Sequence, residues 1–360
     1  MTNLCEQALE FTARQVRRVI ENNLEKNSDF YPMYTQNGRW RHGGESWTHW
    51  CEGFFPGMMW LLWERTGEAF WRQNAERYSR PLEPRKDDRA VHDLGFLFLS
   101  TYLPWHRASG EKALADVLVQ AGRTLALRFR EKGEYLCSFL GPESLFIDIM
   151  MNVGIIFHAA GVTRDKDLWD VAMRHCLTTR RHLVRSDGST AHEGLFDTET
   201  GKFLRQSTRQ GYRDDSCWSR GLAWALYGFG TAFHYSRDPR FLETARACAG
   251  YYLKNTPEGG VPYWDYDVPE GPERFPDTSA GAIAAAGLFR LAQMTREERY
   301  RAAALCATET LAGKFLAHGR DDWEGVLLGG VYHRAKNLGV NESVIWGDYF
   351  FLEALLAAKP

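Results

Sequence analysis

Residues 219–235 read SRGLAWALYGFGTAFHY, and residues 238–255 after them read DPRFLETARACAGYYLKN. The first segment has almost no polar face at helical spacing, so a helix there has to be buried on all sides. The second segment places charged residues on one side and apolar residues on the other, which is typical of a helix with one solvated face. Together they predict a buried helix joined to an amphipathic helix that covers it.

This alternation recurs along the whole chain. Amphipathic helices are expected near residues 4–25, 65–80, 111–130, 165–184, 238–255 and 296–317. Apolar helices rich in Gly, Ala and aromatic residues are expected near residues 53–64, 93–104, 148–161, 219–235, 279–292 and 346–358. Six apolar helices alternating with six amphipathic ones predict an inner ring sheathed by an outer ring, which is the all-α (α/α)6 barrel. Because no Pro/Ser-rich linker divides the chain, we expect one catalytic domain over residues 1–360.

Glycines open or interrupt the predicted inner helices, which indicates close helix approach in a crowded inner ring. Functional residues are then expected to cluster where these helices begin. The turn-rich stretches 186–218 and 257–278 should form loops over the mouth of the barrel, with short hairpins within 191–205 and 261–266.

Composition excludes several function classes. A formal net charge of -2 without a block of Lys or Arg offers no footprint for nucleic acid or an anionic membrane. The N-terminus lacks the features of a signal peptide and no 18-residue apolar segment occurs, so we expect a cytoplasmic protein. Seven dispersed cysteines without a C-x-x-C pair favour neither disulfides nor a zinc site. Aromatic residues make up 14% of the chain, with 13 Trp, and such rings either pack in a core or stack on sugars.

Two aspartates open predicted inner helices. Asp93 lies in His92-Asp93-Leu94-Gly95-Phe96 and Asp148 in Phe146-Ile147-Asp148-Ile149-Met150. Either could simply cap its helix. However, an ionised carboxylate in so apolar a run is expensive to bury, so the pKa of Asp148 should be raised, as in a general acid.

A third segment favours an acidic sugar as ligand. Arg220 and Trp224 lie four residues apart on one predicted helix, so the guanidinium could bind a carboxylate while the indole stacks on the sugar ring. An ordinary Arg–Trp packing pair has the same spacing. Weaker candidates are Trp50, His192 and Gln210. The sequence has no H-E-x-x-H, Gly-rich phosphate loop or G-x-S-x-G motif to anchor metal, nucleotide or serine-hydrolase chemistry.

At this point the chain resembles the unsaturated glucuronyl hydrolases over nearly its whole length. The resemblance is carried by Trp50-Cys51-Glu52-Gly53-Phe54, His92-Asp93-Leu94-Gly95-Phe96, Phe146-Ile147-Asp148 with Asn152, Trp218-Ser219-Arg220-Gly221 with Trp224, Asp277-Thr278-Ser279-Ala280 and Ile345-Trp346-Gly347-Asp348-Tyr349. It implies an (α/α)6-barrel enzyme that uses no metal or cofactor. The implied substrate is the 4,5-unsaturated uronic acid that polysaccharide lyases leave at the non-reducing end of oligosaccharides.

The resemblance also implies residue roles. Asp148 would donate a proton to C4 and then act as base for water, while Asp93 would position substrate hydroxyls and raise the pKa of Asp148. Contacts with the sugar or its carboxylate would come from Arg220, His192 and Gln210. The pocket would be lined by Trp50, Trp218 and Trp224.

A basic stretch, Tyr332-His333-Arg334-Ala335-Lys336, departs from this pattern. We expect Arg334 and Lys336 to favour sulfated disaccharides, although exposed charges are often only solvated. Three other functions stay open from the sequence. They are an unsaturated rhamnogalacturonyl hydrolase, an (α/α)6 sugar epimerase or isomerase, and a non-catalytic sugar-binding protein.

Overall fold

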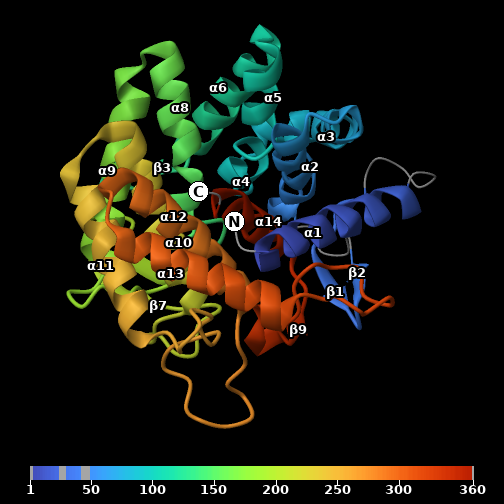
Figure 1. Ribbon diagram of the computed structural model, residues 1–360. Helices are drawn as coiled ribbons and strands as arrows, with labels where there is room; N and C mark the ends of the chain where they lie inside the picture. Colours follow the sequence, from blue (N-terminus) through green and yellow to red (C-terminus); the bar gives the residue numbers. More distant parts are fainter. Residues whose placement is uncertain (1–2, 24–29, 42–48, 359–360) are drawn as a thin grey trace. The chain divides into compact units, whose positions relative to one another are not determined.

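The computed structural model describes residues 3–23, 30–41 and 49–358. Its helices and strands, which Figure 1 labels, belong to two compact units. The terminal unit comprises Met1–Pro81 and Thr256–Pro360, and the middle unit comprises Leu82–Asn255.

The terminal unit joins both ends of the chain through helix packing. Helix α12 packs against α13 and α14, and α14 also contacts α1 and α2, so helices far apart in sequence lie side by side (Figure 1). Its helices are α1 Asn3–Asn22, α2 Phe54–Thr66, α3 Ala69–Ser79, α12 Thr278–Thr295, α13 Glu298–Thr310 and α14 Ile345–Ala357, with short turns η1 His49–Cys51, η3 Leu311–Phe315 and η4 Arg334–Lys336. The six helices predicted in this unit are all found, although residues 24–25 of the first lie outside the described residues.

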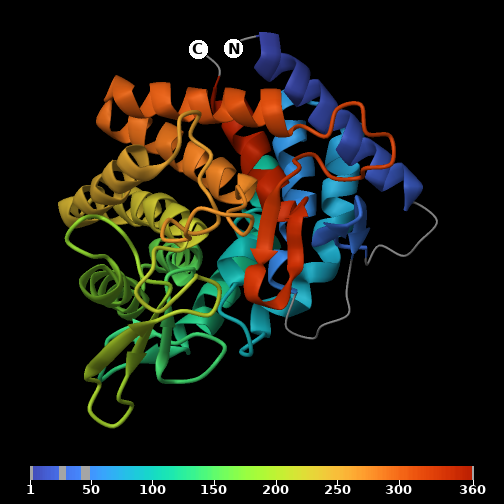
Figure 2. The ribbon, with the colours of Figure 1, turned by 90° about the horizontal axis from the view of Figure 1, so that it is seen from below.

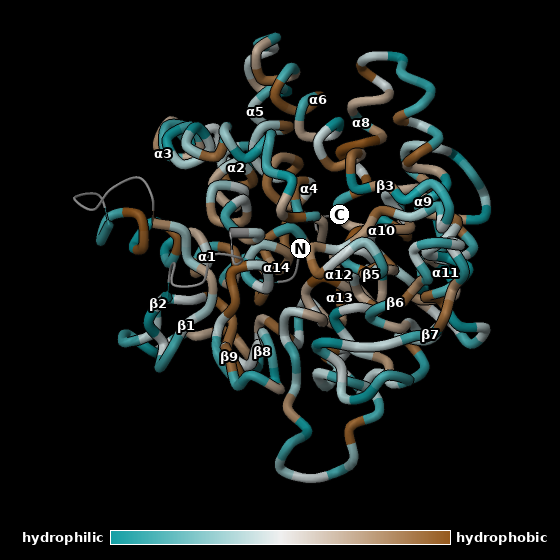
Figure 3. The backbone as a smooth tube through the Cα atoms, turned by 180° about the vertical axis from the view of Figure 1, so that it is seen from behind, coloured by the Kyte–Doolittle hydropathy of each residue, from teal (hydrophilic) through white to brown (hydrophobic). Residues whose placement is uncertain are grey.

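The middle unit contains the other predicted helices. Its elements are η2 Arg80–Asp87, which starts in the terminal unit, then α4 Leu94–Phe98, α5 Tyr102–Ser109, α6 Lys112–Ala126, α7 Ile149–Asn152, α8 Gly154–Thr163, α9 Lys166–Leu183, α10 Ser219–Ser236 and α11 Pro239–Asn255. Hydrophobic residues dominate α10, whereas hydrophilic residues recur along α9 and α11 (Figure 3). The predicted contrast between inner and outer helices is therefore confirmed in this unit.

Two inner helices are broken, contrary to the prediction of continuous helices at 93–104 and 148–161. After α4, the hydroxyls of Ser100 and Thr101 bond back to the carbonyls of Phe96 and Leu97, which bends a helix. After α7, the chain turns at Val153 before α8 begins. These two broken helices are the ones that begin at Asp93 and Asp148.

Five helix pairs share one turn, which the sequence analysis did not single out. It consists of Ser or Thr, a residue with left-handed backbone, and Asp or Glu. The five turns are Thr66-Gly67-Glu68, Ser109-Gly110-Glu111, Thr163-Arg164-Asp165, Ser236-Arg237-Asp238 and Thr295-Arg296-Glu297. At each one, the N–H of the left-handed residue bonds to a carbonyl four residues earlier, so the helix ends there.

Short antiparallel strands occupy several of the connections between helix pairs. They are β1 Tyr34–Gln36 with β2 Arg39–Arg41, β3 Phe129–Arg130 with β4 Tyr135–Leu136, the sheet β5 Ser144–Phe146, β6 Glu193–Phe196 and β7 Phe203–Ser207, and β8 Gly330–His333 with β9 Leu338–Glu342. The β6–β7 hairpin confirms the prediction at 191–205, and Figure 2 shows it in yellow-green. The hairpin expected at 261–266 is wrong, because Tyr263 pairs instead with Pro276 and closes a longer loop.

Candidate active site

Asp93 and Asp148 stand at the starts of α4 and α7 in the middle unit. Asp93 is 7% exposed, and the side chain of Asp148 is 14% exposed. An aspartate at such a position commonly accepts backbone N–H bonds from the first helical turn, as Asp165 and Asp277 do. Neither Asp93 nor Asp148 makes a side-chain capping bond. Their carboxyl groups therefore do not cap the helices.

The β5–β6 pairing places His192 beside Asp148. Phe146 lies opposite Glu193 in this antiparallel pair, and the Ile147 N–H extends it by donating to the His192 carbonyl over 3.0 Å. Asp148 follows one strand and His192 precedes the other. As a result, the His192 Nε2 atom lies 3.9 Å from Asp148 Oδ2.

Backbone donors fix the protonation of His192. The N–H groups of Arg209 and Gln210 approach its Nδ1 atom at 3.1 and 3.2 Å. Because these groups can only donate, Nδ1 has to be the acceptor and the neutral ring carries its hydrogen on Nε2. The loop after β7 therefore directs an N–H of His192 toward Asp148.

Arg220, Gln210 and Trp218 form one cluster in the structure. The Arg220 guanidinium donates to Gln210 Oε1 over 2.5 Å and lies over the Trp218 ring, 4.4 Å from its centroid. Trp218 also contacts His192, with ring centroids 4.6 Å apart. The positive charge of Arg220 acts on Asp148. This cluster combines a buried cation with an aromatic wall.

Trp224 has a different place from the one expected. It was predicted to share a sugar-binding face with Arg220, but its side chain is 1% exposed and packs against Phe96, with centroids 5.1 Å apart. Trp224 thus supports α4 from within the core, while the guanidinium of Arg220 stacks on Trp218.

Asn152 joins the two turns that carry the aspartates. Its Oδ1 atom accepts the N–H of Phe96 over 2.8 Å, and its Nδ2 atom donates to the carbonyl of Asp148 over 3.2 Å. Gly95 permits this approach, since a Cβ atom there would lie 2.5 Å from the Asn152 Cα atom. One side chain therefore ties the start of α4 to the start of α7.

The two carboxyl groups titrate together. Burial raises the pKa of Asp148 to about 7, although Arg220 opposes this shift. The pKa of Asp93 is also raised well above its ordinary range, first by burial and then by the charge of Asp148, with Arg128 opposing. Two carboxylates that repel each other do not both ionise readily. At neutral pH the pair therefore holds a proton, and it can supply an acid and a carboxylate at once.

His92 is a site residue that the sequence reasoning left without a role. Its Nε2 atom lies 3.4 Å from Asp93 Oδ1, and its ring is 2% exposed and stacks on Phe139. Its place directly before Asp93 was the available signal. The partner of its other nitrogen, Phe139, lies 47 residues further on and could not be inferred from the pattern.

Trp50, Arg334 and Lys336 belong to the terminal unit. Trp50 contacts Trp346, with ring centroids 4.7 Å apart, in an aromatic cluster that includes Tyr332. Arg334 and Lys336 lie in η4 between β8 and β9. The Arg334 guanidinium forms an ion pair with Glu273. A carboxylate of the chain itself therefore already neutralises one of the two predicted sulfate ligands.

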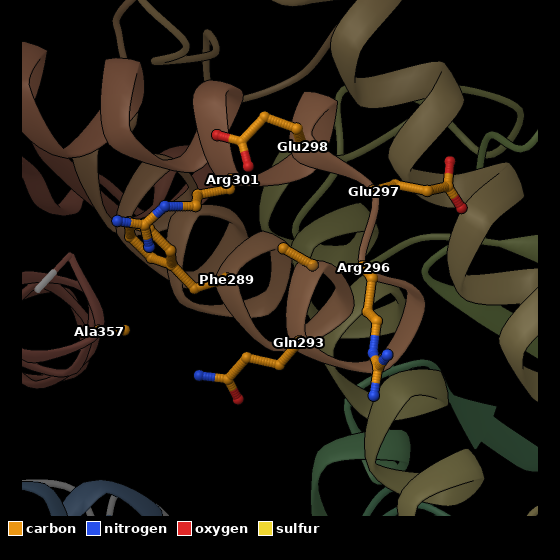
Figure 4. Close-up of a pocket in the computed structure, with 8 residues that line it drawn as sticks. Phe289, Gln293, Arg296, Glu297, Glu298, Arg301 and Ala357 are labelled. Carbon is orange, nitrogen blue, oxygen red and sulfur yellow. The ribbon is translucent and has the colours of Figure 1, made fainter. Parts of the chain in front are cut away.

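A pocket of about 310 Å³ in the terminal unit is not the predicted site (Figure 4). It lies where α12 ends and α13 begins. Its lining residues are Phe289, Ala292, Gln293, Arg296, Glu297, Glu298, Arg301 and Ala357. None of the predicted site residues lines it.

The residues that the structure describes include no group of three or more His, Cys, Asp or Glu side chains that could hold a metal ion. The seven cysteines are free thiols, of which Cys306 is exposed. Among the same residues, no helix combines the length and apolar character needed to cross a membrane.

Known proteins share both the sequence and the fold of this chain. Residues 17–333 match the model of Glycosyl Hydrolase Family 88. The chain is 34% identical to the unsaturated glucuronyl hydrolase of Bacillus sp. (strain GL1), over 94% of this chain and 93% of that relative. It is 30% identical to the unsaturated chondroitin disaccharide hydrolase of Streptococcus pneumoniae (strain ATCC BAA-255 / R6), over 86% and 81% of the two chains.

The crystal structure of the unsaturated glucuronyl hydrolase from Bacillus sp. GL1, described as responsible for the degradation of glycosaminoglycan, matches with a TM-score of 0.91. The match has 30% identity and covers 98% of this chain and 96% of that one. The fold and the paired carboxyl groups thus define an all-helical glycoside hydrolase. The chain belongs to glycosyl hydrolase family 88, whose solved members are (α/α)6 barrels. The predicted resemblance and fold class are confirmed, and the rhamnogalacturonyl alternative is less well supported.

Proposed function

We propose that this chain releases 4,5-unsaturated glucuronic acid from the non-reducing end of lyase-generated oligosaccharides, with glycosaminoglycan-type disaccharides favoured. The observation that carries the proposal is Asp148, a buried carboxyl group that caps no helix. Its pKa of about 7 allows it to be protonated near neutral pH. Arg220, close enough to act on that carboxyl group, supplies a cation for the carboxylate of the sugar.

The reaction begins with the enol ether of the unsaturated sugar. Asp148 donates its proton to C4, and the C4=C5 electron pair forms the new C–H bond, which leaves an oxocarbenium-like centre at C5. A water oxygen bonds to C5 and gives its proton to the Asp148 carboxylate. The hemiketal at C5 then opens and releases the neighbouring sugar. No second carboxylate has to attack the anomeric carbon, unlike in an ordinary retaining glycosidase.

The other site residues hold the sugar for this proton transfer. Asp93 accepts hydrogen bonds from substrate hydroxyls and, through its charge, favours the protonated form of Asp148. His192 and Gln210 bind the sugar next to Arg220, and Trp218 supplies an aromatic wall. Trp50 is a further proposed contact for the substrate, and the buried Trp224 acts through Phe96, which it supports from within the core.

Loss of ultraviolet absorbance tests this function, since the conjugated C4=C5 carboxylate absorbs and the hydrated product does not. Wild type should consume lyase-generated glucuronyl disaccharides, and Asp148→Asn should lose roughly 100- to 10,000-fold in kcat, the range typical of losing a proton donor. Rhamnogalacturonyl products serve as the comparison substrate. If wild type consumes neither product, the epimerase and sugar-binding functions become the better explanations.

For the leaving sugar, we propose that Arg334 and Lys336 bind a sulfate group. Because Glu273 pairs with Arg334, a sulfate has to compete with this carboxylate. Arg334→Ala and Lys336→Ala should therefore raise KM for sulfated but not for unsulfated disaccharides, while Glu273→Gln should lower KM for the sulfated ones. Equal effects on both substrates in all three variants would exclude a sulfate site.

We further propose that residues 1–360 act as one catalytic domain in the cytoplasm. On this proposal the enzyme needs no metal or cofactor and has no nucleic-acid or membrane partner. Its net charge of -2 agrees with the absence of a polyanionic partner.

A further inference from the structure

The ring of His92 is locked in one protonation state by the backbone. The N–H of Phe139 approaches its Nδ1 atom at 3.1 Å. A peptide N–H can only donate, so Nδ1 keeps its lone pair and the neutral ring carries its hydrogen on Nε2. Phe139 stacks on the ring at a centroid distance of 5.5 Å and Phe146 meets it edge-on, which also fixes the ring plane.

The Nε2–H of this ring faces Asp93. Nε2 lies 3.4 Å from Asp93 Oδ1, with both side chains buried. The contact is long for a hydrogen bond, but in a buried site an N–H dipole facing a carboxylate still favours the ionised form.

Arg128 holds the two chain segments that make this arrangement. Its guanidinium donates to the carbonyls of Cys137 and Ser138, directly before Phe139, and to the carbonyl of Arg89, shortly before His92. One half-buried cation thus fixes both the donor to Nδ1 and the segment leading to Asp93.

We propose that His92 is a positioning residue for Asp93, a neutral Nε2–H donor that orients this carboxyl group and favours its ionised form against burial and the charge of Asp148. His192 presents the same tautomer to Asp148. Each carboxyl group then has its own histidine, and neither ring serves as the acid or base. This inference rests on the proposed function for its kinetic readout.

The charged surroundings agree with a neutral His92. Burial lowers the pKa of its ring well below the ordinary value, and the neighbouring Arg128, His192 and His175 lower it further. Asp93 itself faces Asp148 and Arg128 in addition to His92. His92 is therefore uncharged in the range where the carboxyl pair titrates.

Two amide variants separate the two ring nitrogens. In His92→Gln the terminal amide nitrogen takes the place of Nε2 and can still donate to Asp93. In His92→Asn the shorter amide reaches the position of Nδ1 and Phe139, but not Asp93. On an unsaturated glucuronyl disaccharide, the acid limb of the kcat/KM profile should move up by about one pH unit or more in His92→Asn, because Asp93 protonates sooner. His92→Gln should keep the wild-type acid limb.

Some outcomes would overturn the proposal. A merely structural role predicts lower kcat/KM in both variants with unchanged pH limbs, and an equal shift in both variants would show that the Nε2 donor is not the cause. A second readout does not depend on turnover: the ¹³C carboxyl titration of Asp93, assigned with Asp93→Asn, should move to higher pH in His92→Asn only. If wild type shows no turnover, the proposed function fails while this titration still decides the role of His92.

Discussion

At the scale of single residues, two aspartates share a raised pKa but differ in their partners. Burial raises the pKa of both Asp148 and Asp348 to about 7. The two oxygens of Asp348 each accept a backbone N–H, from Val326 over 2.8 Å and from Leu327 over 2.9 Å. Asp148 Oδ1, by contrast, accepts no hydrogen bond from the residues that the structure describes. Hydrogen bonds within the fold therefore compensate for burial of the Asp348 carboxyl group, whereas burial of the Asp148 carboxyl group lowers the stability of the protein.

This difference predicts that the same substitution has different effects on stability at the two positions. Asp148 has a pKa of about 7 in the folded protein and an ordinary pKa of 3.8, so its cost to stability develops as pH rises between these values and is complete above 7. Asp148→Asn should therefore stabilise the protein at pH 8, by roughly 2 to 4 kcal/mol, and have little effect at pH 4. Urea unfolding at pH 4, 6 and 8 measures this.

Asp348→Asn is the matched control. Because burial raises the pKa of Asp348 to about 7 as well, Asp348→Asn should change with pH in the same direction as Asp148→Asn. Its amide N–H₂ has to face one of the two backbone N–H donors, so Asp348→Asn should be less stable than Asp148→Asn by about 1 to 3 kcal/mol at each pH. Equal stability of the two variants at pH 4 would contradict the distinction between a carboxyl group held by the fold and one that is not.

Part of the site could be predicted from local patterns, because Asp93, Asp148 and Arg220 stand where apolar helices begin. His192 and Gln210 lie before a strand and in a loop, and only the resemblance to the family gave them roles. The structure places His192 beside Asp148 and Gln210 beside Arg220. His92 and Asn152 were not given roles, since their partners Phe139 and Phe96 are set by tertiary contacts over 47 and 56 residues. Pairing of Arg334 with Glu273 was likewise invisible in the sequence.

At the scale of elements, hydrophobic periodicity predicted where helices occur but not where they break. It reports which residues are buried, and Ser100 and Thr101 are as buried as their apolar neighbours. Their hydroxyls nevertheless compete for helix carbonyls and interrupt the inner helix. Similarly, the aromatic run at 261–266 suggested strands, but Trp264 bonds across a longer loop to Phe275.

The repeated turn between helices predicts a stabilising substitution. Arg164 ends α8 with φ 58°, a left-handed conformation that favours glycine, and its side chain is exposed. Arg164→Gly should raise the free energy of unfolding by about 0.5 to 1 kcal/mol, and Arg164→Ala should not. Thermal or urea unfolding compares the three proteins.

Gly110 offers the reciprocal test. It has φ +70° at the equivalent turn, and a Cβ atom there would meet nothing within 4 Å. Gly110→Ala should therefore lose about 1 kcal/mol through backbone strain alone. A gain in stability at Gly110, or a loss in Arg164→Gly, would show that side-chain contacts rather than backbone conformation govern these turns.

At the scale of the whole molecule, buried acids and buried imidazoles act against each other as pH changes. Raised pKa values of Asp93, Asp148 and Asp348 mean that folding takes up protons above pH 4. Lowered pKa values of His92 and His175 mean that folding releases protons below about pH 6.5. Since both effects fall between pH 4 and 7, they partly cancel, and the stability of the whole chain should depend only weakly on pH there.

Removing one imidazole should make the opposing effect of the buried carboxyl groups on stability measurable. His175 is fully buried, its Nδ1 atom accepts the N–H of Leu136, and burial lowers its pKa to about 3. The stability it contributes is present above pH 6.5 and is lost as pH falls toward 3. His175→Asn keeps an acceptor for Leu136 but has no group that titrates. As pH rises from 4 to 6, wild type gains stability that the variant does not gain. The free energy of unfolding of His175→Asn should therefore fall behind that of wild type by about 1.4 kcal/mol for each pH unit, and the difference should level off above pH 6.5. Parallel unfolding curves for the two proteins across this range would show that His175 is not held neutral by burial.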